Sequence, residues 1–262
     1  MNVLESFSLK GKTVLLTGGA GKYGRQIMTA LAEAGAETYI ASRNLEALDE
    51  VASHERAYGH SVTALQLDLG DEKSIFALHQ EIMRRSGKID VLINNAVTRS
   101  ATNGWNNPLE EFDLSLHVNA SALFTITRIF AEEMKKSQSG SIINIGSMMG
   151  MVGVEMGNYE NTGMNANPSP IYFYEKGGMI NFTRWAASIL GSANIRVNCV
   201  SPGGLFTPDL PSQFVKNYSD RTQLGRMAND TDLKGIIVFL ASDASKYITG
   251  TNIPVDGGYT AK

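Results

Sequence analysis

Short apolar runs alternate with longer segments of helical pattern along the whole chain. Seven such runs occur, at Thr13 to Thr17, Glu37 to Ala41, Val62 to Leu67, Val91 to Asn94, Ser141 to Ile145, Ile195 to Val200 and Ile253 to Val255. Strands that alternate with helices are typical of a parallel sheet covered by helices on both faces. Because right-handed crossovers leave few topologies, we predict an α/β fold with a Rossmann-type, doubly wound, seven-stranded, mainly parallel sheet.

The intervening segments predict the helices that cover this sheet. They are Arg25 to Ala34, Asn44 to Tyr58, Asp71 to Arg85, Leu109 to Lys136 as one long helix, Ile171 to Leu190, and Asp232 to Ala241. No linker or repeat divides the 262 residues, so we expect a single domain over 1–262. We expect the irregular stretch 150–170 to be an active-site insertion, and 208–227 to be a lid over the substrate.

Composition argues against several classes of function. The net charge of −3 gives no reason to expect a nucleic-acid partner, and no apolar run approaches the roughly 20 residues of a membrane helix. The single cysteine, Cys199, excludes an intramolecular disulfide, and the four histidines lack metal-ligand spacing. Met1 to Lys12 lacks the apolar middle of a signal peptide. We therefore expect a cytoplasmic protein that acts on a small molecule without a metal.

A glycine-rich segment, Thr17 to Gly24, follows the first predicted strand and opens the first helix. A phosphate needs backbone N–H groups close by, and glycine lets the chain approach it at a helix N-terminus. Glycine clusters also form ordinary strand-to-helix turns, so the motif alone is weak evidence. Its position at the first βα turn favours a dinucleotide site.

The end of the second predicted strand bears on the choice of cofactor. No acidic residue stands near Ser42 and Arg43 to accept hydrogen bonds from the ribose of NAD. Arg43 could pair with a 2′-phosphate and Ser42 could donate to it, so we predict that NADP is preferred and NAD possible. The alternative is that Arg43 is a solvated charge at a helix start. Asp68 and Leu69 are expected at the adenine, or Asp68 caps the following helix.

Tyr172 and Lys176 lie four residues apart on a predicted helix and share one face. Hydride transfer between an alcohol and a carbonyl requires a proton to move at the oxygen. A tyrosine hydroxyl is a poor base at neutral pH, but an ammonium about 4 Å away favours its ionised form by roughly 4 kcal/mol. The pair is therefore a candidate for acid–base catalysis. An isolated pair of this kind is also compatible with two structural residues.

Other polar residues stand at predicted strand ends or inside predicted helices. Ser147 follows the fifth strand, where it can orient a substrate oxygen or simply cap a turn. Asn119 lies inside a predicted helix, an unfavourable place for asparagine. Asn94 is expected to tie neighbouring strands together. Tyr174 points away from Lys176, towards packing or the substrate cleft. Pro202-Gly203 follows the sixth strand, where an ordinary turn is the alternative.

In this order, the residues resemble the short, single-domain branch of the short-chain dehydrogenase/reductase family. The resembling segments are Thr17 to Gly24, Asp68-Leu69, Asn94 to Ala96, Asn119, Ser147, Tyr172 to Lys176, Asn198 with Pro202-Gly203, Thr207, and Val255 to Gly258. The resemblance implies that Tyr172 is the acid/base, that Lys176 assists it and holds the nicotinamide ribose, and that Asn119 holds a proton-relay water.

The same resemblance implies the cofactor-binding set. It comprises Gly18, Gly21, Lys22, Tyr23, Gly24, Ser42, Arg43, Asp68, Leu69, Asn95, Ala96, Tyr172, Lys176, Pro202, Gly203, Leu205 and Thr207. Two positions depart from the family pattern: Lys22 replaces the usual middle glycine, and Val97 replaces the glycine after Ala96. The family also commonly forms tetramers, so we expect a homotetramer built through the two long helices and the last strand. Gly177 and Gly178 indicate that a helix or the cofactor packs closely there.

The separation of Ser147 from Tyr172 is longer than the family usually shows. The excess contains side chains suited to a polyhydroxylated ligand, namely Tyr159, Glu160, Asn161, Asn165 and Asn167. The segment Phe7 to Lys12 is similar to gluconate dehydrogenases. We therefore predict a polar, sugar-like substrate in contact with Ser147, Tyr159, Tyr172 and Tyr174. The alternatives are an insertion that serves oligomer contacts, an apolar ketone or alcohol as substrate, and a non-catalytic dinucleotide-binding regulator.

Overall fold

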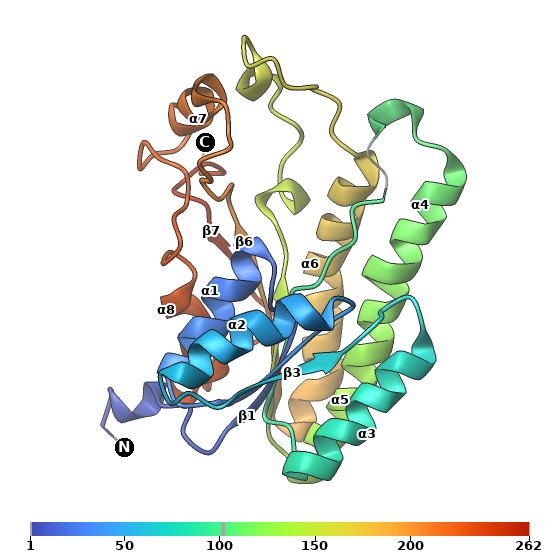
Figure 1. The fold of residues 1–262 in the computed structure, drawn as a ribbon, viewed down its shortest axis with the longest axis vertical. Coiled ribbons are helices and arrows are strands. Elements are labelled where there is room, and N and C mark those ends of the chain that lie inside the picture. The colour runs from blue at the N-terminus through green and yellow to red at the C-terminus, as the bar shows by residue number, and fades with distance from the viewer. Residues whose placement is uncertain (1, 101–102, 262) are drawn as a thin grey trace.

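A computed structural model describes residues 2–100 and 103–261 and confirms the doubly wound α/β fold (Figure 1). Within these ranges the strands are β1 (Thr13–Thr17), β2 (Glu37–Ser42), β3 (Val62–Gln66), β4 (Val91–Asn94), β5 (Gly140–Ile145), β6 (Ile195–Pro202) and β7 (Asn252–Val255). They form one sheet in the order β3-β2-β1-β4-β5-β6-β7, and every neighbouring pair is parallel. The strand order reverses between β1 and β4, where such sheets bind ligands.

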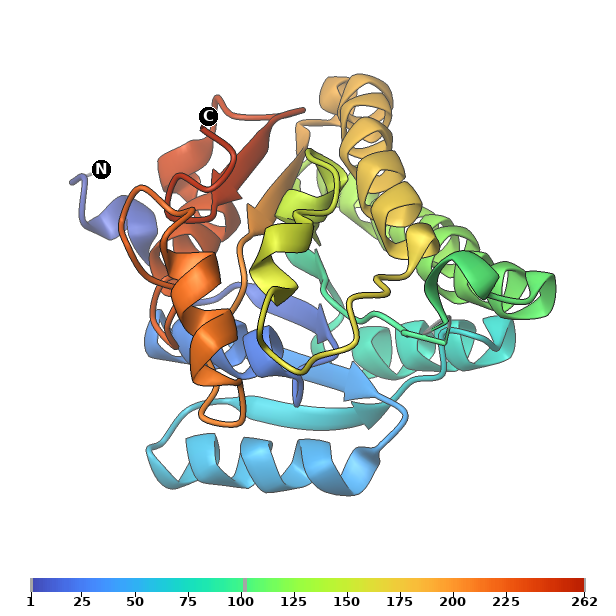
Figure 2. The ribbon, with the colours of Figure 1, turned by 90° about the horizontal axis from the view of Figure 1, so that it is seen from above.

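Helices cover both faces of the sheet (Figure 2). One face carries α1 (Lys22–Glu33), α2 (Leu45–Ala57) and α8 (Lys234–Ala241), and the other carries α3 (Glu72–Ser86), α5 (Ala122–Ser137) and α6 (Pro170–Leu190). Two shorter helices complete the fold: α4 (Leu109–Leu116) continues the line of α5 at the side of the sheet, and α7 (Ser212–Ser219) lies beyond the carboxyl ends of the strands (Figure 1). None of the described helices is both long enough and apolar enough to cross a membrane.

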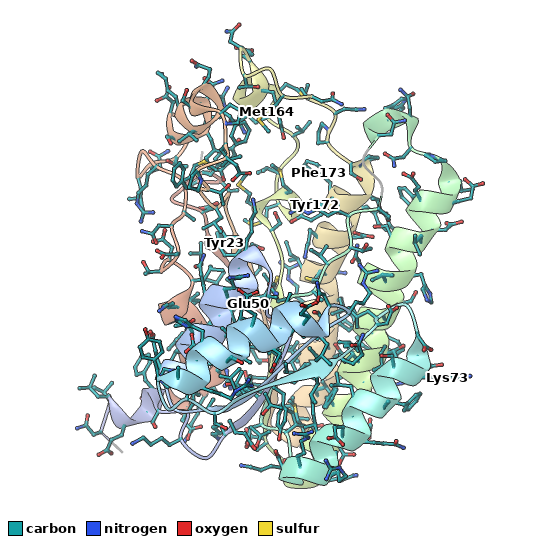
Figure 3. All side chains as sticks on the ribbon, in the orientation of Figure 1. Tyr23, Glu50, Lys73, Met164, Tyr172 and Phe173 are labelled. Carbon is teal, nitrogen blue, oxygen red and sulfur yellow. The ribbon has the colours of Figure 1, made fainter. Side chains whose placement is uncertain are left out.

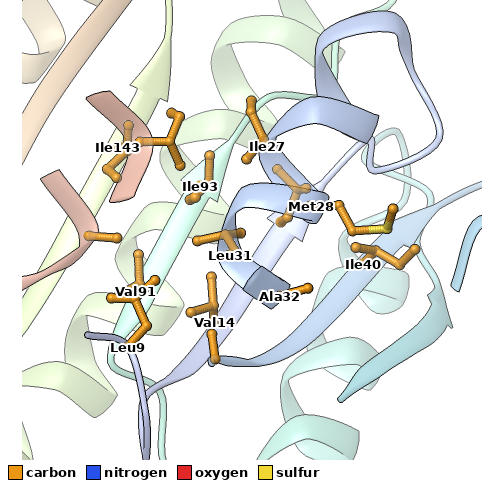
Figure 4. Packing of buried hydrophobic residues seen from close by; sticks show 14 of the residues in the cluster. Leu9, Val14, Ile27, Met28, Leu31, Ala32, Ile40, Val91, Ile93 and Ile143 are labelled. Atoms are coloured by element: carbon orange, nitrogen blue, oxygen red, sulfur yellow. The ribbon is translucent and has the colours of Figure 1, made fainter. Parts of the chain in front are cut away.

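The core divides into two layers because successive strand residues point to opposite faces of the sheet. Val14 and Leu16 of β1 pack in one cluster with Leu31 of α1, whereas Leu15 packs in the other with Phe130 of α5. Figure 4 shows the first layer, in which Leu31 lies among Val14, Ile27 and Ile93. A strand buried on both faces needs an unbroken apolar run, which explains the runs in the sequence.

The segment predicted as one long helix from Leu109 to Lys136 is instead interrupted. A π-helical turn, His117–Ser121, separates α4 from α5. Asn119 in this turn accepts a hydrogen bond from the N–H of Thr98 at 2.8 Å and donates from Nδ2 to the Thr98 carbonyl at 2.9 Å. The turn therefore accommodates an asparagine that a regular helix disfavours, and it anchors the loop after β4. Such π turns often occur at functional sites.

The insertion 150–170 lies against the segment 208–227, which is not wholly irregular because it contains α7 (Figure 2). Asn217 of α7 donates to the carbonyl of Glu160 at 2.9 Å, and the Tyr159 ring lies 5.6 Å from the ring of Phe214. At its other end the insertion places the Asn167 side chain where a Cβ on Gly104 would stand. It therefore spans from the segment after β4 to α7, above the sheet edge.

Candidate active site

The glycine loop is folded too tightly to admit side chains at Gly18, Gly19 and Gly24. Gly18 has φ +72°, and a Cβ there would come within 2.9 Å of the Ala96 Cα, while a Cβ on Gly24 would overlap the carbonyl of Gly18. Helix α1 begins at Lys22, three residues before its predicted start, with Gly21 as N-cap and no side chain capping its first turn. Uncapped amides beside a bare backbone fit a phosphate group.

The segment after β4 is bonded directly to this loop. Thr17 Oγ1 accepts hydrogen bonds from the N–H groups of Asn95 and Ala96, both at 3.0 Å. Asn95 Nδ2 donates to the carbonyls of Thr17 and Gly18 at 2.9 and 3.0 Å. Asn95 and Ala96, both expected to bind the cofactor, thus meet the glycine loop at the strand-order reversal. Val97, which replaces the family's glycine, is exposed and leaves these bonds intact.

The structure rejects one alternative at the third strand end and leaves both open for Arg43 at the second. Arg43 is exposed directly before Asn44, which caps α2 by accepting from the N–H of Ala47 at 3.0 Å. In the described ranges, no salt bridge engages the Arg43 guanidinium. The alternative that Asp68 caps α3 is wrong, because Asp71 is the N-cap and Asp68 accepts instead from the N–H of Gly70 at 2.9 Å. Leu69 lines a small cavity beside Thr17 and Ala96.

Residues predicted for the nicotinamide side lie against the first turn of α1. The Tyr23 hydroxyl donates to the carbonyl of Gly203, just after β6, at 2.8 Å. Lys22 Nζ lies 3.5 Å from Thr207 Oγ1. Pro202 ends β6, and Leu205 forms a β-bridge with Ala228. Lys22, which replaces the family's usual glycine, thus lies next to the segment that follows β6.

The predicted catalytic pair lies on α6 above the carboxyl edge of the sheet, below Met164 of the insertion in the view of Figure 3. Lys176 is 4% exposed; its Nζ donates to the Ile145 carbonyl at 2.7 Å and lies 5.7 Å from the Tyr172 ring centroid. Burial lowers the pKa of Lys176. The last residue of β5 therefore holds the ammonium beside Tyr172.

Two further predictions concern glycines of α6. The close approach at Gly177 comes from Gly150 of the insertion, where a Cβ would overlap the backbone of Lys176, and not from a neighbouring helix. At Gly178 no described atom lies within 4 Å of a Cβ position. Within one chain, therefore, the packing expected at Gly178 is absent from the described residues.

Ser147 and Asn94 both make structural hydrogen bonds. Ser147 is 7% exposed and caps a short turn by accepting from the N–H of Met149 at 3.1 Å, so the turn-cap interpretation applies. Its own hydroxyl proton is not used in that bond. Asn94 donates to Asn144 at 2.9 Å and to Thr127 at 3.1 Å, which confirms that it ties β4 to β5.

Two residues near Tyr172 were missed by the sequence analysis. The Arg99 guanidinium carbon lies 5.2 Å from the Tyr172 ring centroid, and Glu175 Oε2 accepts a hydrogen bond from Asn119 Nδ2 at 2.9 Å. Arg99 follows β4, so the rule that ligands bind at the carboxyl edge could have identified it. Glu175 stands beside Lys176 in the sequence, and its acidic character on a buried helix was the available signal.

The predicted substrate residues do not all gather at this site. Tyr174 is 67% exposed and packs 6.4 Å from Phe112 of α4, so the structure gives it the packing role. Tyr159 packs on Phe214, which places it between the insertion and α7. Among the described residues, no group of three or more His, Cys, Asp or Glu side chains is arranged to hold a metal ion.

Comparisons with known proteins agree with this geometry. A family model described as enoyl-(acyl carrier protein) reductase matches residues 23–260. The chain is 33% identical to 3-oxoacyl-[acyl-carrier-protein] reductase FabG of Thermotoga maritima over 255 residues, covering 95% of this chain and 98% of the relative. It is also 33% identical to cyclopentanol dehydrogenase of Comamonas testosteroni over 256 residues, covering 95% and 97%.

Solved structures extend the likeness to the whole fold. A short-chain type dehydrogenase/reductase from Mycobacterium marinum superposes with a TM-score of 0.88 at 30% identity over all of both chains. A gluconate 5-dehydrogenase from Burkholderia cenocepacia, in complex with NADP and tartrate, superposes with a TM-score of 0.88 at 27% identity, again over both full chains. The chain therefore belongs to the short-chain dehydrogenase/reductase family and is an NAD(P)-dependent oxidoreductase that acts on CH–OH groups.

Proposed function

We propose that the protein interconverts an alcohol and a carbonyl on a polar, sugar-like substrate, with NADP as the preferred cofactor and Tyr172 as the acid/base. The observation that carries this proposal is the setting of the Tyr172 ring, with Arg99 at 5.2 Å and Lys176 at 5.7 Å from its centroid. Lys176 is buried and favours an ionised partner, whereas Arg99 is exposed and accessible to a substrate. The single cysteine, Cys199, is buried, which is compatible with a cytoplasmic location.

Each residue has a distinct task in this proposal. When bound, the dinucleotide accepts or supplies the hydride at the substrate carbon. Tyr172 takes the hydroxyl proton as the carbonyl forms and returns it in the reverse direction. Ser147 donates a hydrogen bond to the substrate oxygen and orients it, and it keeps its proton. Lys176 is fixed by the Ile145 carbonyl, so its charge stays beside Tyr172 throughout.

We expect Tyr172→Phe to reduce kcat by about 10²- to 10⁴-fold, because it removes the proton-transfer group and leaves the ring in place. Tyr174→Phe is the matched control, since that hydroxyl belongs to an exposed ring packed on Phe112. Nicotinamide absorbance at 340 nm measures turnover, and fluorescence quenching measures cofactor binding. Full activity in Tyr172→Phe contradicts the mechanism; wild-type protein that binds cofactor without turnover of any substrate favours a regulator.

The preference for NADP rests on Arg43 and Ser42 at the end of β2. Arg43 is exposed and follows the strand end that faces an adenosine ribose in such folds. No carboxylate occupies this strand end, so nothing there repels a 2′-phosphate. The gluconate 5-dehydrogenase neighbour was solved with NADP.

We expect Arg43→Ala to raise KM for NADPH by about 10- to 100-fold, since a hydrogen bond to a charged group is worth about 1.5–3 kcal/mol. KM for NADH serves as the internal control and stays constant, because NADH lacks the 2′-phosphate. Lys22→Ala is expected to weaken the binding of NADPH and of NADH to the same extent. Equal loss for NADPH and NADH in Arg43→Ala removes the basis for the NADP preference.

The substrate class is supported by the polar surroundings of Tyr172. Arg99 reaches the ring from the loop after β4, and Asn119 fixes that loop through both backbone groups of Thr98. Above it, we propose that 150–170 forms the roof of the substrate site and 208–227 its lid. Asn217 joins these two segments by its bond to Glu160, and Arg221 pairs with Glu155 at 3.3 Å.

We expect polyols and sugar acids to be turned over in preference to apolar ketones of similar size. Arg99→Met retains the apolar part of the side chain and removes the charge, so it should raise KM for a sugar acid by about tenfold or more and leave KM for a neutral polyol unchanged. Steady-state kinetics on a panel that includes cyclic ketones checks both statements. Activity confined to apolar ketones contradicts the sugar-like substrate.

We propose that the protein assembles as a homotetramer in which α5 and α6 meet a second copy. The α5–α6 patch comprises Phe124, Gly178, Phe182, Trp185 and Ile189. Trp185 is 52% exposed and stacks on Phe182 at 5.7 Å, with Phe124 at 6.4 Å. Gly178 leaves open space that a second helix can enter. An exposed apolar patch of this kind marks an interaction surface.

Trp185→Glu is expected to dissociate the assembly, because it places a charge in the centre of the α5–α6 patch. Tyr58→Glu, on a residue 70% exposed at the end of α2, is the control and should leave the assembly intact. Light scattering after gel filtration gives the mass of each variant. A monomeric wild-type protein, or a Trp185→Glu variant of wild-type mass, overturns this assignment.

A further inference from the structure

A buried carboxyl group lies between the two residues of the catalytic pair in the sequence. Glu175 is 7% exposed and faces α4 and the π-helical turn. Its Oε2 accepts from Asn119 Nδ2 at 2.9 Å, whereas its Oε1 is buried and has no hydrogen-bond partner in the described part of the chain. Burying a polar group without a partner is costly, so this position calls for a compensating role.

The polar and charged groups near Glu175 and Lys176 come from five elements. Ser115 of α4, Asn119 of the π turn and Lys176 of α6 act on Glu175, whereas Tyr172 of α6, Cys199 of β6 and Arg99 of the loop after β4 act on Lys176. Burial raises the pKa of Glu175, and the Ser115 and Asn119 side chains, followed by the charge of Lys176, oppose that rise. Burial lowers the pKa of Lys176, whereas Tyr172, Cys199 and then Glu175 raise it and Arg99 lowers it further.

Lys176 therefore depends on nearby negative charge to stay protonated in a buried site. The Tyr172 and Cys199 side chains favour its charged form only when they are ionised, and Ser115 and Asn119 are neutral. Glu175 is the carboxyl group among these neighbours. Glu175 also accepts a hydrogen bond from Asn119, and Asn119 in turn holds Thr98 in the loop that carries Arg99.

We propose that Glu175 is a positioning residue for the reaction, which fixes Asn119 and, when ionised, keeps Lys176 protonated at alkaline pH. This inference rests on the proposed role of Lys176 beside Tyr172. It does not depend on the identity of the substrate or on the choice between NAD and NADP.

The sign of the effect follows from the two charges. Removing the carboxylate lowers the pKa of Lys176, so the ammonium is lost at a lower pH and the alkaline limb of the rate profile moves down. Glu175→Gln retains an oxygen that accepts from Asn119 and removes only the charge. We expect the alkaline limb of kcat/KM to shift down by about one pH unit, with the neutral-pH rate lowered only a few-fold.

The experiment compares full-length wild type, Glu175→Gln and Glu110→Gln from pH 6 to 10.5, on whichever alcohol the wild type oxidises. Glu110 is an exposed carboxyl on α4, so its variant controls for a general loss of negative charge. Glu175→Met, of similar size and without a polar group, is measured as well, in case the glutamine variant does not fold. An unshifted alkaline limb in the folded variants overturns the proposal.

A second measurement separates this proposal from the catalytic one. Because burial raises the pKa of Glu175 in the folded state, wild type should lose stability relative to Glu175→Gln as pH rises from about 4.5, the region where the unfolded carboxyl ionises. Thermal melts of the two proteins test this without substrate. If Tyr172→Phe is active but the melting temperatures of wild type and Glu175→Gln diverge with pH as expected, the proposed function fails and the buried charge of Glu175 stands. If the two melting temperatures change in parallel with pH, the buried charge of Glu175 is rejected.

Discussion

The hydrogen bond from Lys176 Nζ to the Ile145 carbonyl, 2.7 Å long, joins α6 to the end of β5. Lys176 is 4% exposed; this carbonyl fixes its ammonium, and its backbone passes where a side chain on Gly150 would stand. Both depend on the parallel sheet, which brings the carboxyl ends of β1, β4, β5 and β6 to one edge. The glycine loop lies at that edge, where it is bonded to Asn95 after β4, and Tyr23 at the start of α1 is bonded to Gly203 after β6.

Layering makes this edge rigid. Val14 and Leu16 fix β1 to the α1 side, and Leu15 fixes it to the α5 side. A slip of one residue would exchange side chains between these two close-packed layers, so the packing of both layers holds the register of β1. Thr17 at the end of β1 and Asn95 directly after β4, which are bonded to each other, therefore keep a constant relation to α1 and α6. This constancy is what a hydride transfer between two bound molecules requires.

The strands and the packed helices could be predicted from sequence because they follow periodic burial. The glycine loop was identified by its place before α1, although α1 starts at Lys22 and not at Arg25. The break at Asn119 could not be predicted, because it depends on a hydrogen bond to Thr98, 21 residues away. Periodicity describes which face a residue occupies, and it contains no information on such pairings.

Arg99 and Glu175 were missed for related reasons. Arg99 lies in a loop without periodicity; its place after β4 puts it at the carboxyl edge, but its contact with the Tyr172 ring follows from the fold. Glu175 lies on a helix face whose burial comes from α4, an element whose direction is set by the π turn. Tyr174, which the sequence places near the substrate, is turned outward by the same helix geometry that turns Tyr172 inward. Side chains two positions apart on a helix point about 200° away from each other. Once the packing of α6 on the sheet turns Tyr172 towards the carboxyl ends of the strands, Tyr174 must point away from them.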